Sequence, residues 1–435
     1  MATDSANLIT LDDWLTYLQS IHVSAIDMGL ERVIPVFKKL GIDKGDAYVF
    51  TVAGTNGKGS TTTTIAQICQ TAGYKTALYQ SPELFTFNER VKINGEMVSD
   101  NQLIATFKQI EQARIDCNLT LSFFEITTLA ALLIFQKARC DVWVLEVGLG
   151  GRLDVVNVID PDLAVITNIG IDHVDWLGDT REKIGMEKAG ILRDGITMVY
   201  GESDMPSTIP PIIAEKNVKC LHYGIDFDYR CEAKADTWYY SNAALTLALP
   251  KAQLSTHNLA TALTAVLASP LPITQSQIAT ALAQTKLAGR FDKREIAQRT
   301  WLFDVAHNTH GIDFLLQHFI PVWQQYQVQY PRARLHLLFS MLLDKDLDGV
   351  LTSLKKLPFA SVHAGVISHP RAADYDRLHR ALTQHFSTDA LCLFYSLAEA
   401  TDSAIEHSHD EDMILVCGSF YTIAGVLKHL PSPSA

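Results

Sequence analysis

Residues 47–60, AYVFTVAGTNGKGS, decide the fold of the first half of the chain. The first seven of them include β-branched and aromatic side chains, which favour a short buried strand that ends at Gly54. Beyond the glycine-containing turn, Ile65, Ile68 and Ala72 recur at helical spacing, so a helix follows. A strand, a glycine loop and a helix in this order predict a parallel α/β sheet with a phosphate-binding turn.

The turn itself has the chemistry of a loop that binds a nucleoside triphosphate. Glycines let backbone N–H groups approach phosphate oxygens, the following helix presents its positive end, and Lys58 can reach the outer phosphates. The standard pattern is broken twice, because Val52 occupies the first glycine position and Gly59 follows the lysine, so Ser60 has to supply the hydroxyl. The alternative is a tight glycine turn with a solvated lysine, and the flanking strand and helix argue against it. The expected phosphate loop is Gly54, Thr55, Asn56, Gly57, Lys58, Gly59 and Ser60.

Apolar strand patterns and helical patterns keep alternating along the rest of the chain, which is typical of an α/β fold. Short aromatic-rich stretches between residues 220 and 251 break this alternation and indicate a small antiparallel addition. We expect an N-terminal P-loop ATPase domain with a mainly parallel sheet, residues 1–293, and a C-terminal Rossmann-like α/β domain, residues 294–435. The expected strands are 47–53, 75–80, 141–147, 163–168 and 197–200 in the first domain, and 301–305, 334–339, 361–366, 391–395 and 413–417 in the second. The main expected helices are 60–72, 99–116, 124–138, 257–268 and 274–286.

Composition excludes several classes of function. The chain has 435 residues, 48% of them hydrophobic, and 48 Asp and Glu against 36 Lys and Arg give a net charge of −12. This charge repels the phosphates of nucleic acids and of anionic membranes, so neither is an expected partner. No apolar run is long enough to span a membrane, and the N-terminus lacks the basic region of a secretory signal. The seven cysteines are scattered and odd in number, which indicates buried thiols in a reducing compartment, and we expect the protein in the cytoplasm.

Polar side chains stand at the ends of several predicted strands, where ligands of parallel sheets bind. Glu146 closes the strand 141–147, and a lone carboxylate there suits Mg²⁺, which takes few protein oxygens besides phosphates and water. Asp172 and His173 follow the next strand and either ligate metal, orient phosphate or belong to an ordinary polar loop. Asp304 ends a strand of the second half, a weak signal taken alone.

Two charged segments are expected to form solvent-exposed surface and not functional sites. Residues 181–192 form a charged helix for which a solvated face is the default. His407 and His409 lie among five acidic residues between positions 402 and 412, the densest such cluster in the chain. This segment reads as a loop before an apolar strand, and we expect a solvated surface there.

Ten segments, in this order, resemble the Mur ligase superfamily, and within it the folylpolyglutamate synthase family that includes bifunctional dihydrofolate synthases. The resemblance covers nearly the whole chain. The segments are SAIDMGLERV (24–33), GTNGKGS (54–60), QSP (80–82) with NERV (88–91), FFE (123–125), LEVGLGGRLD (145–154), DH (172–173), EKAGI (187–191), HN (257–258), GRF (289–291) and FDVAHN (303–308). Two positions depart from the family pattern: Glu83 stands where histidine is usual, and Thr309 stands where proline is usual.

This resemblance implies an ATP-dependent ligase that adds L-glutamate to dihydropteroate and to tetrahydrofolate through an acyl phosphate, releasing ADP and phosphate. It implies small-molecule partners only, and we expect a monomer. The implied catalytic residues are Lys58, Glu146, His173 and Lys188, with Lys188 carbamylated. The implied ligands of two Mg²⁺ sites are Ser60, Ser81, Glu146 and His173. Asn258, Arg290 and Asp304 match positions that bind ATP from across an interdomain cleft. Ala25, Ile26, Asp27, Ser122, Phe123, Phe124, Glu125 and Asp154 match the pterin-side substrate pocket.

Two other functions remain open at this stage. A peptidoglycan Mur ligase needs room near the N-terminus for a UDP-sugar, but only about 46 residues precede the first phosphate-loop strand, fewer than a domain of usual size. A nucleotide-gated regulatory protein would hydrolyse ATP without ligation. ADP release that depends on glutamate distinguishes a ligase from that protein.

Overall fold

A computed structural model describes residues 8–22, 27–231 and 237–431, and its chain divides into two compact units. The first comprises Met1–Ala252 and Thr256–Thr285, and the second comprises Gln253–Ser255 and Lys286–Ala435. The division therefore falls after Thr285, whereas the sequence analysis placed the boundary after residue 293. The difference arises because β12 (Asp292–Ile296) pairs antiparallel with β13 (Arg299–Phe303) and so belongs to the second unit. The charged sequence of β12 hides this strand from an analysis of hydrophobic patterns.

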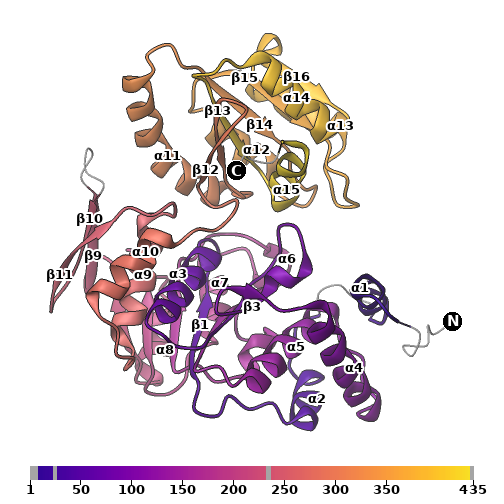
Figure 1. The fold of residues 1–435 in the computed structure, drawn as a ribbon, viewed down its shortest axis with the longest axis vertical. Coiled ribbons are helices and arrows are strands. Elements are labelled where there is room, and N and C mark those ends of the chain that lie inside the picture. The colour runs from indigo at the N-terminus through magenta and orange to yellow at the C-terminus, as the bar shows by residue number, and fades with distance from the viewer. Residues whose placement is uncertain (1–7, 23–26, 232–236, 432–435) are drawn as a thin grey trace. The chain divides into compact units, whose positions relative to one another are not determined.

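The first unit, whose strands β1 and β3 are labelled in Figure 1, is built on an eight-stranded sheet with the order β4-β3-β2-β5-β1-β6-β7-β8. The six strands from β2 to β8 in this order run parallel, which confirms the mainly parallel sheet. A hairpin of β3 and β4 extends one edge antiparallel and was not expected. The strands are β1 (Tyr48–Ala53), β2 (Thr76–Tyr79), β3 (Val91–Ile93), β4 (Glu96–Met97), β5 (Val142–Glu146), β6 (Leu163–Ile166), β7 (Thr197–Tyr200) and β8 (Lys219–His222).

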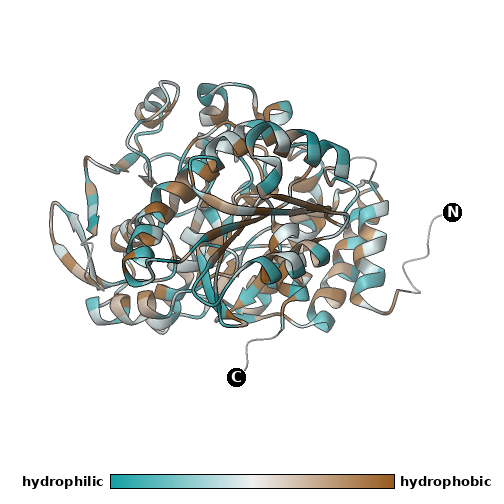
Figure 2. Ribbon diagram, turned by 90° about the horizontal axis from the view of Figure 1, so that it is seen from above, coloured by the Kyte–Doolittle hydropathy of each residue, from teal (hydrophilic) through white to brown (hydrophobic). Residues whose placement is uncertain are grey.

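Helices bury the apolar side chains of this sheet. Tyr79, Trp143 and Leu145 face a core formed with α1 (Leu11–Ser20), α2 (Val33–Leu40), α4 (Asp100–Asp116) and α5 (Phe123–Ala138). Helices α9 (Thr256–Ala268) and α10 (Gln275–Gln284) both pack on α3 (Lys58–Thr71), which also packs against β1, β2 and β5. Figure 2 shows the hydropathy of the whole chain, with strands that are mostly hydrophobic and helices that carry both hydrophobic and hydrophilic residues.

Three short strands form a separate antiparallel sheet with the order β11-β10-β9. They are β9 (Phe227–Cys231), β10 (Thr237–Asn242) and β11 (Thr246–Pro250), and they confirm the expected antiparallel addition. Trp238 and Tyr240 of β10 are fully buried, which explains the aromatic alternation in this stretch.

The second unit contains a six-stranded sheet with the order β12-β13-β17-β14-β15-β16, parallel except for β12. All five strands expected from the sequence are present: β13, β14 (Leu335–Phe339), β15 (Phe359–Gly365), β16 (Leu391–Phe394) and β17 (Met413–Cys417). The helices are α11 (Thr309–Gln329), α12 (Leu347–Leu354), α13 (Tyr375–His385), α14 (Leu397–His407) and α15 (Phe420–His429). This unit confirms the second α/β fold.

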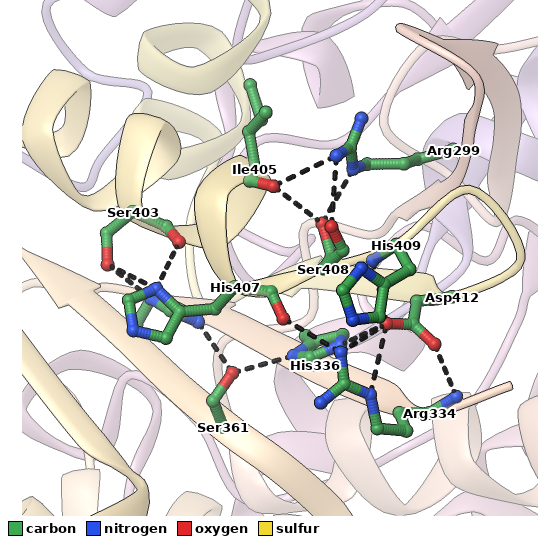
Figure 3. Close-up of polar contacts among 11 residues, drawn as sticks. Arg299, Arg334, His336, Ser361, Ser403, Ile405, His407, Ser408, His409 and Asp412 are labelled. Atoms are coloured by element: carbon green, nitrogen blue, oxygen red, sulfur yellow. Dashed lines mark hydrogen bonds and ion pairs between the residues drawn. The ribbon is translucent and has the colours of Figure 1, made fainter.

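The expected solvated surface at residues 402–412 is wrong for Asp412 (Figure 3). Its carboxylate is only 2% exposed and accepts hydrogen bonds from Arg334 Nη2 at 2.9 Å and from His336 Nε2 at 3.1 Å. Both partners come from the start of β14, far away in the sequence, so the pairing of β14 with β17 buries this carboxylate. The other acidic residues of the segment and both of its histidines are exposed, as expected.

The buried polar contacts continue from Asp412 across the sheet through serine and histidine side chains. His336 Nδ1 lies 2.6 Å from Ser361 Oγ, and the same hydroxyl lies 2.6 Å from His363 Nε2. His363 Nδ1 in turn lies 3.0 Å from Ser403 Oγ on α14. Burial, and then the charges of His407 and His336, lower the pKa of His363 to about 3, so its imidazole is neutral near pH 7.

Within the described ranges, no helix combines the length and the apolar character that crossing a bilayer requires. All seven cysteines are free thiols. Three of them are buried and Cys231 is exposed, so the expected burial holds for only part of the set.

Candidate active site

The strand order of the first unit brings the segments that carry the expected phosphate and metal residues to one edge of its sheet. In the parallel register Glu146 lies beside Val52, Ala53 lies beside Ile166, and Tyr79 lies beside Leu145. The carboxyl ends of β2, β5, β1 and β6 are therefore neighbours. Ser81, Glu146, the phosphate loop and the segment with Asp172 and His173 follow these ends.

Two glycines of the phosphate loop are required by their surroundings. Gly54 and Gly57 have φ angles of 151° and 82°, which side chains rarely adopt. A Cβ atom on Gly54 would lie 1.8 Å from Thr167 Oγ1, and one on Gly57 would lie 2.5 Å from Asn258 Oδ1. The helix α3 begins directly afterwards at Lys58, so its first turn of amides faces the loop.

The phosphate loop is hydrogen-bonded to the segment that follows β6. Asn168 Oδ1 accepts from the Asn56 N–H at 2.9 Å, and Asn168 Nδ2 donates to the Asn56 carbonyl at 3.1 Å. Thr167 Oγ1 donates to the same carbonyl at 2.6 Å. Thr55 Oγ1 donates to the Gly170 carbonyl and accepts from the Gly170 N–H, both at 3.0 Å. Thr167 and Asn168 are the last two residues of the expected strand 163–168, and neither was expected to hold the phosphate loop.

Lys58 and the start of α3 are held by short polar contacts. Lys58 Nζ donates to the carbonyls of Gly54 at 3.1 Å and Thr55 at 3.4 Å, which places the ammonium over the loop. Gln80 Nε2 donates to the Gly59 carbonyl at 2.8 Å, so the residue before Ser81 is fixed against the loop. Gln80 was part of a quoted motif but had been assigned no role.

Lys188 is the most perturbed cation of the site. It lies on α7 (Arg181–Ala189) and is only 3% exposed. Burial, and next the positive charge of Lys58, lower the pKa of Lys188 to about 7, while Asp172 and Asp154 oppose the shift. Lys188 is therefore within electrostatic reach of Lys58, Asp154 and Asp172, and all four residues had been singled out from the sequence. At neutral pH a large fraction of Lys188 is an uncharged amine, the form that reacts with carbon dioxide.

Asp154 shapes the glycine-rich segment after β5. One carboxylate oxygen accepts from the Leu149 N–H and the other from the Val156 N–H, both at 2.9 Å. Burial raises the pKa of Asp154 to about 6, against the effect of these amides and of Lys58. Beside this turn, a Cβ on Gly148 would lie 2.3 Å from the ring of Phe124, so the ring lies directly on the backbone.

His173 adopts a left-handed backbone conformation, with φ 52° and ψ 44°, immediately before the short helix α6 (Val174–Leu177). Its N–H donates to Asp172 Oδ1 at 2.9 Å, and its side chain is 38% exposed. In the described parts of the chain, no three His, Cys, Asp or Glu side chains form a ready metal site. Ser60, Ser81, Glu146 and His173 offer two hydroxyls, one carboxylate and one imidazole, and such a sparse donor set suits Mg²⁺, which takes phosphate and water oxygens as its other ligands.

The expected pterin-side residues are joined by Arg32, which lies in the quoted segment 24–33 but had been assigned no role. Arg32 bridges two expected residues, with Nη1 3.0 Å from Asp27 Oδ2 and Nη2 2.8 Å from Glu125 Oε1. His22 Nε2 lies 2.9 Å from the same Asp27 oxygen. Glu125 and Ser122 also cap α5 reciprocally, so their side chains serve the helix end. Ala25 and Ile26 lie outside the described residues.

The two departures from the family pattern both have partners. Glu83 forms an ion pair with Arg90, whose guanidinium carbon lies 5.7 Å from the centre of the Phe123 ring. Thr309 Oγ1 donates to Asp346 Oδ2 at 3.3 Å. Each substitution therefore makes a side-chain contact of its own.

The nucleotide residues implied by the resemblance are divided between the units. Asn258 belongs to the first unit and packs on Gly57, so its expected position across a cleft from the phosphate loop is wrong. Arg290 and Asp304 belong to the second unit. Asp304 follows β13 and accepts from the Phe291 N–H at 2.9 Å. Burial raises the pKa of Asp304, and the charge of Arg290 opposes the rise.

Comparison with known proteins agrees with this organisation. Residues 52–266 match the Mur ligase middle domain, and residues 289–420 match the Mur ligase, glutamate ligase domain. The chain is 41% identical to the dihydrofolate synthase/folylpolyglutamate synthase of Escherichia coli (strain K12), over 96% of this chain and 95% of that protein.

Solved structures are similar over almost the full length. The E. coli FolC structure in complex with DHPP and ADP has a TM-score of 0.89 and 39% identity, with 98% of both chains covered. A bifunctional folylpolyglutamate synthase/dihydrofolate synthase with Mn, AMPPNP and L-glutamate bound has a TM-score of 0.87 and 35% identity, covering 98% of this chain and 99% of that one. The chain therefore belongs to the dihydrofolate synthase/folylpolyglutamate synthase family of Mur ligases.

Proposed function

We propose that this chain joins L-glutamate to dihydropteroate, forming dihydrofolate, and to tetrahydrofolate, forming folylpolyglutamates, with ATP as the energy source. The observation that carries the proposal is the phosphate loop at the same sheet edge as Glu146, beside the buried Lys188. The relatives named above bind DHPP, ADP, AMPPNP and L-glutamate, which supports these substrates for a chain of the same family.

The chemistry requires activation because a carboxylate is a poor electrophile and oxide is a poor leaving group. In the proposed first step a carboxylate oxygen of the pterin substrate attacks the γ-phosphorus of ATP, and the bond to the β,γ-bridging oxygen breaks, which gives an acyl phosphate and ADP. The uncharged amino group of L-glutamate then attacks the acyl carbon, phosphate leaves, and the nitrogen loses a proton to form the amide. Exclusion of water protects the acyl phosphate from hydrolysis.

The residues of this chain have distinct parts in that reaction. Lys58 offsets the charge that spreads over the transferring phosphoryl oxygens, and the phosphate-loop amides hold the remaining phosphates. The resemblance assigns Arg290 of the second unit to ATP binding. Asp304 and Asn258 help to bind the nucleotide, and Asp27, Phe123 and Phe124 hold the pterin side.

We propose two Mg²⁺ sites that use Ser60, Ser81, Glu146 and His173. Bound Mg²⁺ would neutralise and orient the phosphate oxygens. Carbamylation of Lys188 joins its uncharged amine to carbon dioxide with loss of a proton, which replaces a buried cation by an anion able to steady the metal ions. The lowered pKa of Lys188 supports this modification.

Incorporation of radiolabelled glutamate, measured with each acceptor and together with ADP release, tests the proposal. The wild type should form both amides and should release ADP fully only when acceptor and glutamate are both present. Lys58→Ala and Glu146→Gln should lower turnover on the order of a hundredfold or more without loss of fold. Lys183→Met, which removes an exposed lysine of α7, is the control. ADP release at the same rate without glutamate, with no amide formed, would point to a regulatory ATPase instead.

We further propose that the enzyme acts as a monomer in the cytoplasm on small molecules alone. The seven free thiols support a reducing compartment, and the net charge of −12 disfavours nucleic acid as a partner. Light scattering of the purified chain tests the monomer.

A further inference from the structure

The segment that follows β6 is fixed on two sides. On one side Thr167, Asn168 and Gly170 bond the phosphate loop, as described above. On the other side both backbone polar groups of the fully buried Ile169 are bonded to side chains. The Ile169 N–H donates to Glu202 Oε2 at 3.1 Å, and the Ile169 carbonyl accepts from Arg181 Nε at 2.7 Å.

These two side chains also pair with each other, since Arg181 Nη2 lies 3.1 Å from Glu202 Oε2. We call Arg181 and Glu202 the Ile169 anchor. Arg181 forms a further ion pair with Asp204 and donates from Nη2 to the Asp204 carbonyl at 3.2 Å. The buried Tyr200 donates its hydroxyl to that same carbonyl at 3.0 Å. The anchor therefore joins the segment after β6 to the end of β7 and to the start of α7.

An ordinary surface ion pair contributes little to stability, and the anchor side chains are partly exposed. The anchor differs from such a pair because it satisfies a buried backbone N–H and a buried carbonyl that would otherwise be left unbonded. Ile169, which the anchor holds, lies three residues before Asp172 and four before His173. The left-handed backbone of His173 is strained and needs its surroundings to hold it. Small displacements of a residue next to a metal weaken binding without changing the fold.

We propose that Arg181 and Glu202 are positioning residues, which act through Ile169 to set Asp172 and His173 against the phosphate loop and thereby strengthen binding of the metal–nucleotide complex. The inference rests on the proposed function in one respect, the assignment of His173 to the metal site. Neither residue touches the nucleotide in this assignment.

Calorimetric titration of the full chain with ADP, once in excess EDTA and once in saturating Mg²⁺, tests the anchor. Arg181→Met should lower the Mg²⁺-dependent gain in ADP affinity about tenfold but change the affinity in EDTA less than about twofold, because Thr167 and Asn168 still hold the phosphate loop. Glu202→Gln should have a smaller effect, since its amide oxygen can still accept from the Ile169 N–H. Lys183→Met on the same helix, exposed and paired only with the exposed Asp179 in the described contacts, should match the wild type.

Three results would overturn the anchor. An equal loss of affinity in EDTA and in Mg²⁺ would indicate a general disturbance of the loop, and unchanged affinities in both variants would reduce the pair to a surface contact. A wild type whose ADP affinity does not respond to Mg²⁺ would remove the effect that the anchor is proposed to strengthen. Failure of the ligase function is a separate result, because it is read from glutamate incorporation and leaves the ADP titrations interpretable.

Discussion

Replacing Lys188 by methionine should stabilise the protein while abolishing ligation. The side chain is 3% exposed, and its pKa of about 7 lies well below the 10.5 of an ordinary lysine. The unfolded chain therefore binds a proton at this lysine more readily than the folded chain does, and the folded state is penalised at neutral pH. Linkage gives about 4 kcal/mol at pH 7 for a shift of this size. Methionine keeps most of the apolar stem and removes the titrating amine, so the free energy of unfolding should rise by up to about that amount.

The sign of the pH dependence follows from the same shift. The penalty is full below the folded pKa of about 7 and disappears as the pH rises through 10.5, where the unfolded lysine also loses its proton. The advantage of Lys188→Met over the wild type should therefore shrink to about 2 kcal/mol at pH 9. Glutamate incorporation by the variant should be lost at both pH values.

Guanidinium unfolding of wild type, Lys188→Met and the exposed-site control Lys183→Met, in buffers freed of carbon dioxide, measures the effect. The control should stay within about 0.5 kcal/mol of the wild type. The reasoning is refuted if Lys188→Met unfolds with equal or lower free energy at pH 7 with an unchanged denaturant slope, or if its advantage is the same at pH 7 and pH 9. Repeating the wild-type measurement with added bicarbonate shows whether carbamylation relieves the penalty.

Three further predictions concern other parts of the chain. Gly57→Ala places a Cβ atom 2.5 Å from Asn258 Oδ1 at a φ of 82°, so ADP affinity in titration calorimetry should fall at least about tenfold, and wild-type affinity would contradict the loop geometry. His363→Gln removes an imidazole whose pKa of about 3 lies below the ordinary 6.5, so the wild type should lose free energy of unfolding relative to the variant as the pH falls from 6.5, by about 3 kcal/mol at pH 4. Acid-unfolding curves of wild type and variant that run parallel would exclude this. Arg32→Met leaves the carboxylate of Glu125 without its guanidinium partner and should raise KM for the pterin substrate about tenfold while KM for ATP stays constant; equal changes in both would show a general loss of fold.

The parts of the site that depend on residues close together in the sequence could be predicted from the sequence. The strand, glycine loop and helix around Gly54 to Ser60 were evident because side-chain periodicity and glycine spacing act locally. The positions of Glu146 and His173 followed from strand ends, since the carboxyl ends of parallel strands share one edge. The exposed part of the acidic segment near residue 407 was evident from charge density alone. The hairpin of β3 and β4 escaped notice because two short strands carry too little pattern.

Only the tertiary structure decided which residues distant in the chain contact each other and which charge states burial creates. Strand order placed Asn168 against the phosphate loop, and the packing of α9 on α3 placed Asn258 on Gly57. The pairing of β14 with β17 buried Asp412 beside His336. A pKa depends on the water and charge that surround a group in three dimensions, so no spacing along the chain predicts the value of about 7 at Lys188. The sequence by itself determined the succession of strands, loops and helices along the chain and the residue types at the end of each element. Folding decided which of those ends meet, because hydrogen bonds and desolvation act through space and not along the chain.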